Sequence, residues 1–140
     1  MPGNNFSPSA SFGLLLMRVG SAALLVFGHG WGKLVHFSEK APKFADPLHI
    51  GTGRSLALTI FAEVICATLV GLGFATRFAS AVIVIMFTVI TFVVMRGAAF
   101  DDRELAMIYA MPFLCLMFTG GGAYALDTRF GPKLKFGGGK

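Results

Sequence analysis

Long apolar segments separated by short polar ones make up most of this chain. The pattern predicts helices over about residues 12–31, 55–74, 78–95 and 104–119. About 20 helical residues, rising 1.5 Å each, cross the hydrocarbon core of a bilayer. The last segment is the shortest and contains Pro112, which predicts a kink. We therefore predict an all-α fold, an integral membrane four-helix bundle with four transmembrane helices.

The polar segments divide the chain into three parts. Residues 1–11 carry no charged side chain and predict a disordered N-terminal tail. Residues 12–122 form the predicted four-helix transmembrane domain, and residues 123–140 predict a basic, Gly-rich C-terminal tail. The tail before the first span lacks the basic region of a cleaved signal peptide, so we expect that span to remain in the mature protein.

The composition supports a membrane environment. Hydrophobic residues make up 55% of the chain and charged residues 14%, whereas soluble domains have about 25% charged residues. The net charge is +5, but the basic residues flank apolar segments and form no dense cluster that would follow a nucleic acid backbone. The predicted partner of this charge is the lipid bilayer with its anionic headgroups, and nucleic acid is excluded.

Four spans place both termini on one side of the membrane. Counting Arg18 with the terminal side, six basic residues fall on each side, while most acidic residues lie opposite the termini. We expect termini on the cytoplasmic side, although the count of basic residues alone decides nothing.

Two charged residues interrupt the apolar spans, Arg18 in the first and Glu63 in the second. A charge inside a bilayer is costly unless it finds a partner or reaches the surface. We expect Arg18 and Glu63 to form a buried ion pair. The alternative is that Arg18 extends to the headgroups while Glu63 stays protonated. Either arrangement serves a ligand or proton site, or only the register of the helices.

Three further residues carry candidate chemistry. His29 lies three turns after Arg18, and it suits binding of a quinone carbonyl, proton relay, haem ligation or a structural place at the interface. Cys66 and Cys115 fall at similar depths, so they are either two apolar side chains or a disulfide, and their redox activity stays open. The sequence contains no CxxC and no spacing of metal ligands, so no metal site is predicted.

Three motifs together resemble the DoxX family of membrane proteins. The segment LLMRVGSAALLVFGHGWGKL is similar to the first helix of that family, with its Arg, His-Gly and Gly-x-Lys-Leu. FAEVICATLVGLGFATR resembles the second helix, and GGGAYALD resembles the closing signature. The resemblance covers Phe12 to Asp127, and its matching polar positions are Arg18, His29, Lys33, Glu63 and Arg77.

The resemblance implies a four-helix protein of the bacterial inner membrane. Some relatives are linked to thiosulfate oxidation coupled to quinone and others to thiol or redox-stress systems. We therefore expect a redox-associated membrane subunit or anchor for an oxidoreductase, with quinone as the ligand. The chain itself holds no electron-carrier motif, so we expect at most a non-catalytic or quinone-binding subunit and no other cofactor.

Two other function classes stay open. Charged residues at depth also suit a small transporter or channel, which with four spans requires a homo-oligomer. The Gly28-x-x-x-Gly32 pair and the uncharged third span suit helix packing in a structural assembly subunit of a larger complex.

Overall fold

The computed structural model of the 140-residue chain describes residues 6–130, and within that range every regular element is a helix. The elements are α1 (Pro8–Leu25), η1 (Val26–Gly30), α2 (Trp31–Val35), α3 (Phe37–Lys40), η2 (Ala41–Lys43), α4 (Thr52–Ile60), η3 (Phe61–Cys66), α5 (Ala67–Leu72), α6 (Thr76–Val89), η4 (Ile90–Val94), α7 (Phe100–Thr119) and α8 (Asp127–Phe130). Of these, η1, η3 and η4 are π-helical and η2 is a 3₁₀-helix.

Consecutive elements join into long continuous helices. Three of them are long and apolar enough to cross a membrane, namely Pro8–Val35, Thr52–Leu72 and Thr76–Val94. Large apolar side chains are exposed along them, among them Phe27, Phe78 and Phe92. Apolar patches of this extent on a helix surface indicate contact with lipid rather than water. The predicted all-helical membrane class is therefore confirmed for these three spans.

The fourth predicted span, 104–119, corresponds to α7. This helix continues through Pro112, and it differs from the other three in its charged start, where Asp101, Asp102, Arg103 and Glu104 follow one another. Because of these charges, α7 is not among the helices that are long and apolar enough to cross a membrane. Its passage through a membrane remains a prediction.

The first helix starts earlier than predicted. It begins at Pro8 rather than Phe12, because the Ser7 hydroxyl accepts a hydrogen bond from the Ala10 amide and Pro8 suits the first helical turn. Residues 8–11 are therefore helical and not part of a disordered tail. Residues 1–5 of the predicted N-terminal tail lie outside the described residues, as does the C-terminal segment 131–140.

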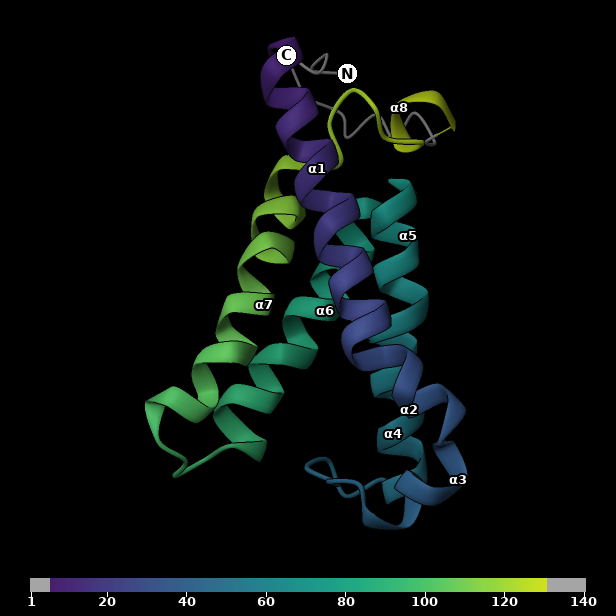
Figure 1. The fold of residues 1–140 in the computed structure, drawn as a ribbon, viewed down its shortest axis with the longest axis vertical. Helices are drawn as coiled ribbons and strands as arrows, with labels where there is room; N and C mark the ends of the chain where they lie inside the picture. The colour runs from purple at the N-terminus through teal and green to yellow at the C-terminus, as the bar shows by residue number, and fades with distance from the viewer. Residues whose placement is uncertain (1–5, 131–140) are drawn as a thin grey trace, which may run out of the picture.

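The helices pack as two pairs that share a core. α6 packs along α7, and α1 packs along α5 (Figure 1). Small and apolar side chains fill the space between them, and the core is formed by Leu25, Cys66, Ala67, Val70, Ala79, Ile83, Phe87, Phe113 and Leu116. The start of α1 lies at the same end as α8, while α3 lies at the other end with the connection from α6 to α7 (Figure 1).

The C-terminal part of the described chain is ordered by Asp127. Its carboxylate accepts hydrogen bonds from the amides of Ala75 and Thr76, at 2.7 and 2.8 Å, and so caps the N-terminus of α6. Its own amide donates to the Gly73 carbonyl at 2.8 Å. Residues 123–130 are thus part of the folded domain, contrary to the predicted loose tail.

The connection between α3 and α4 is also ordered, by Asp46. Its carboxylate accepts hydrogen bonds from the Ser55 hydroxyl at 2.8 Å and from the amides of Gly51 and Ile50 at 2.9 and 3.0 Å. The Ser55 hydroxyl and then these amides lower the pKa of Asp46 below its ordinary value. The segment before α4 therefore has a defined path.

We expect Asp127→Ala to destabilise the protein, because two amides at the start of α6 lose their acceptor. The expected loss is about 1 kcal/mol, as for other helix caps. Denaturant titration of the protein in micelles measures it, with Asp102→Ala on exposed α7 surface as the control. Equal losses for the two variants would contradict the capping role.

Candidate functional site

Arg18 of α1 is 2% exposed and donates hydrogen bonds only to backbone carbonyls among the described residues. Its Nε donates to the Gly71 oxygen at 3.1 Å. One terminal nitrogen donates to the Gly121 oxygen at 2.6 Å and the other to the Tyr124 oxygen at 3.3 Å. The planar fork of a guanidinium suits three acceptors on two different segments. Arg18 therefore ties α5 to the closing segment, which we define as residues 120–126.

Glycines leave the space that this arginine occupies. A Cβ on Gly121 would lie 2.5 Å from the Ala125 Cβ and 3.0 Å from an Arg18 nitrogen. A Cβ on Gly73 would lie 2.8 Å from the same nitrogen, and the backbone there has φ of +78°. Gly73 thus meets two requirements, a close approach and a left-handed conformation.

The predicted ion pair between Arg18 and Glu63 is wrong. Side chains on a helix lean toward its N-terminus. On the first helix, that direction takes Arg18 toward the end where α5 finishes. The second helix is antiparallel, so the same rule takes Glu63 the opposite way, toward Lys33.

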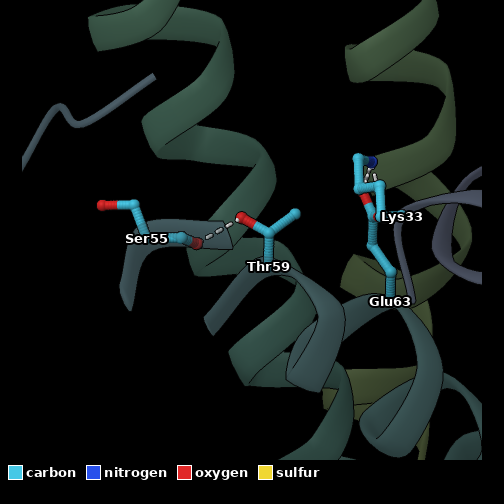
Figure 2. Close-up of polar contacts among 4 residues, drawn as sticks. All are labelled: Lys33, Ser55, Thr59 and Glu63. Atoms are coloured by element: carbon cyan, nitrogen blue, oxygen red, sulfur yellow. Dashed lines mark hydrogen bonds and ion pairs between the residues drawn. The ribbon is translucent and has the colours of Figure 1, made fainter. Parts of the chain in front are cut away.

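Lys33 is the actual partner of Glu63. The Lys33 Nζ lies 2.6 and 2.8 Å from the two carboxylate oxygens, and Figure 2 shows the two side chains meeting between neighbouring helices. The Lys33 side chain is 22% exposed and that of Glu63 is 3% exposed. A few residues away, the Thr59 hydroxyl donates to the Ser55 carbonyl of its own helix (Figure 2). The pair is therefore closed on the Glu63 side and open on the Lys33 side.

Two π-helical segments meet at this ion pair. Glu63 belongs to η3, and Gly30 of η1 packs directly on it, since a Cβ there would lie 2.7 Å from Val64 and 3.0 Å from the Glu63 Cβ. The close contact between the two helices is at Gly30 and not at the predicted Gly28 and Gly32 pair, because a Cβ at Gly32 would meet open space. Interruptions of this kind are frequent at functional sites.

His29, the last but one residue of η1, faces α7 rather than Glu63. Its ring meets Tyr109 edge to face, with centroids 4.9 Å apart, and Tyr109 stacks on Phe87 at 6.0 Å. Neither the His29 ring nor the Tyr109 hydroxyl forms a hydrogen bond within residues 6–130. Two polar groups thus remain available in an otherwise apolar region.

A groove of about 480 Å³ runs beside Tyr109, between α1 and α7. Its walls are almost entirely apolar. They are formed by Leu16, Met17, Gly20, Ser21, Leu24, Leu105, Ile108, Tyr109 and Pro112. The Ser21 hydroxyl donates to the Met17 carbonyl of its own helix, and Tyr109 is the other residue of the wall that carries a polar group on its side chain.

The remaining candidates lie apart from this region. Arg77 is exposed in the first turn of α6, with its guanidinium beside Gly120. Cys66 is buried and Cys115 is exposed, and both are free thiols. The five predicted site residues therefore separate into Arg18 and Arg77 near the terminal end, the Lys33–Glu63 pair farther along, and His29 against α7.

A family model described as DoxX matches residues 13–96, which is more than half of the chain. The chain belongs to the DoxX family. The matched region contains all five predicted site residues, two of the three apolar spans and most of the first, so this DoxX-family chain is a multi-pass membrane protein. No curated protein and no solved structure gave a match.

Several residues that build these sites lie beyond the region matched to DoxX. They include Tyr109, the carbonyls of Gly121 and Tyr124, and the Asp127 cap. Sequence reasoning missed Tyr109 as a site residue, and the signal for it was a single tyrosine within the apolar part of α7. The partnership of Lys33 with Glu63 was also missed, although side-chain direction on antiparallel helices predicts it.

We expect Arg18→Ala to lower the free energy of unfolding by about 3 kcal/mol, because three carbonyls lose a charged donor. Unfolding in mixed micelles measures this loss. The control is Arg54→Ala, which removes an exposed arginine from α4 and should change stability by less than about 0.5 kcal/mol. A loss for Arg18→Ala as small as that of the control would show that the buried contacts contribute nothing.

Lys33→Met should cost about 3 kcal/mol, because it leaves the Glu63 carboxylate buried without a cation. The double variant Lys33→Met, Glu63→Met should recover most of that loss, since a buried ion pair replaced by apolar side chains is often neutral. The same unfolding assay applies to both. The single variant Glu63→Met completes the comparison. A loss in the double variant equal to the sum of the losses in Lys33→Met and Glu63→Met would mean that the two side chains do not interact.

Proposed function

We propose that this DoxX-family protein is a redox-associated membrane subunit that binds a flat lipid-soluble ligand of the quinone class. The supporting observation is the apolar groove that Tyr109 helps to line, together with the contact of the Tyr109 ring with the His29 ring. Ligand sites are mostly apolar with a few placed polar groups, and a volume of several hundred Å³ is typical of them.

The residues of the groove fit such a ligand. A ring bearing two carbonyls packs on apolar walls such as Leu24 and Ile108, and its isoprenoid tail continues into lipid between α1 and α7. In this proposal the Tyr109 hydroxyl donates a hydrogen bond to one carbonyl. The His29 ring lies outside the groove wall and contacts the ring of Tyr109 from the side. When bound, the quinone would supply the capacity to accept electrons, and the protein supplies binding and orientation.

A partner is part of this proposal. The sequence contains no CxxC or nucleotide-binding motif, so electrons would come from an associated oxidoreductase for which this chain acts as membrane subunit or anchor. The exposed apolar surfaces of the third span also suit association with a second copy.

We place the chain in the bacterial inner membrane with four passes and cytoplasmic termini. The support for a fourth pass is that α7 is 20 residues long, about 30 Å, and packs along α6. Its charged first turn lies at the end shared with α3, where charges meet water or headgroups (Figure 1).

The Lys33–Glu63 pair favours a second candidate, an oligomeric transporter. A buried carboxylate held by a partly exposed lysine at a π-helical contact is a place where an ion or solute pathway would pass. Flux into liposomes that Glu63→Gln abolishes would support it over the first proposal.

We expect Tyr109→Phe to weaken binding of a radiolabelled short-chain ubiquinone analogue about 10-fold, because one hydrogen bond to a carbonyl is lost. Equilibrium binding to the protein in nanodiscs measures the affinity. The matched control is Tyr124→Phe, the other tyrosine, whose side chain is exposed at the terminal end. No saturable binding by the unmodified protein, or equal losses in the two variants, would count against the proposed site.

A further inference from the structure

A second pocket lies at the opposite end of the molecule from α8 (Figure 1). It has a volume of about 580 Å³ and lies where α2 turns into α3 and η2. Its walls are formed by Lys33, His36, Glu39, Lys40, Lys43 and Phe44. We call it the loop pocket. The groove beside Tyr109 shares none of these residues, so the two sites are separate.

The charge of the loop pocket favours an anion. Three lysines face one glutamate, and Lys33 is already held by Glu63. Within residues 6–130 that pair is the only ion pair, so the ammonium groups of Lys40 and Lys43 have no carboxylate partner there. The His36 Nδ1 contacts the Gly32 carbonyl at 3.0 Å, which leaves the other ring nitrogen available.

The path of the chain keeps these lysines together. Lys40 ends α3 and Lys43 ends the 3₁₀ turn that follows, with Pro42 between them. The segment after them is held to α4 through the hydrogen bonds of Asp46. The lysines are therefore presented by an ordered connection.

The surroundings of the loop pocket are apolar. Trp31, Leu34, Val35 and Phe37 are all exposed on α2 and α3 directly before the lysines. Tryptophan followed by lysine is typical of the boundary between membrane and water. A ligand in this position meets cations at one end and hydrocarbon-binding side chains at the other.

We propose that the loop pocket binds the phosphate headgroup of an anionic phospholipid. Lys40 and Lys43 pair with the phosphate, Phe44 covers it from one side, and the acyl chains lie along the exposed side chains of α2. The phosphate group could equally belong to a free anion, but the adjoining apolar surface favours the lipid. The site goes beyond the proposed quinone groove and does not depend on it.

Titration of the full-length protein in neutral detergent, followed by native mass spectrometry, tests this assignment. The probes are dioleoyl phosphatidylglycerol and dioleoyl phosphatidylcholine. We expect phosphatidylglycerol to bind roughly 10-fold more tightly, since the zwitterionic lipid has no net charge. The double variant Lys40→Gln, Lys43→Gln should weaken phosphatidylglycerol binding roughly 10- to 30-fold, at about 1 kcal/mol for each lysine.

The matched control is Arg54→Gln, Arg96→Gln, which removes two exposed charges outside the loop pocket. It should change phosphatidylglycerol binding less than about 3-fold. Equal losses in both double variants would overturn the site in favour of general surface attraction. Millimolar inorganic phosphate should not displace the lipid, and displacement would overturn the lipid assignment in favour of a free anion. Circular dichroism of each variant confirms that its helices are retained.

Discussion

The burial of one guanidinium determines how the terminal end of this protein is built. Arg18 sits 2% exposed among three backbone carbonyls from α5 and the closing segment. Those carbonyls converge only because Gly73 and Gly121 leave no side chain in the way. The closing segment then carries Asp127 to the start of α6. Taking the guanidinium charge out of water costs free energy. Hydrogen bonds to carbonyls offset this cost here, rather than an opposite charge in direct contact.

Composition and the apolar pattern predicted the helical membrane class, because three of the segments are long and apolar enough for a bilayer crossing. They also singled out Arg18 and Glu63 as charged positions that require partners, whereas Lys33 entered only through the resemblance to the DoxX family. They could not assign those partners, because depth was judged from the Cα position alone. Each side chain points toward the N-terminus of its own helix. On these two antiparallel helices, Arg18 therefore points toward the end where α5 finishes, and Glu63 points toward the opposite end. Side-chain direction, not residue depth, decided the pairing of Lys33 with Glu63.

The ordered ends were harder to predict, since their order depends on contacts distant in sequence. Residues 123–130 precede a basic, Gly-rich sequence, so local composition predicts that they are part of a tail. Their fold depends on Arg18, more than 100 residues earlier, and on the amides of Ala75 and Thr76. Local composition contains no signal for such contacts. The early start of α1 is different, because Ser7 followed by Pro8 is a local start signal that the apolar pattern outweighed.

The distribution of hydrogen bonds separates structural polar groups from those available to a ligand. Buried polar groups are normally bonded, and Arg18 and Glu63 follow that rule. Among the described residues, His29 and Tyr109 contact each other through their rings. A lipid environment offers no water to satisfy polar groups, and this is the physical argument behind the proposed carbonyl ligand. The same reasoning places the proposed ligand at α7, away from the ion pair that sequence features alone would single out.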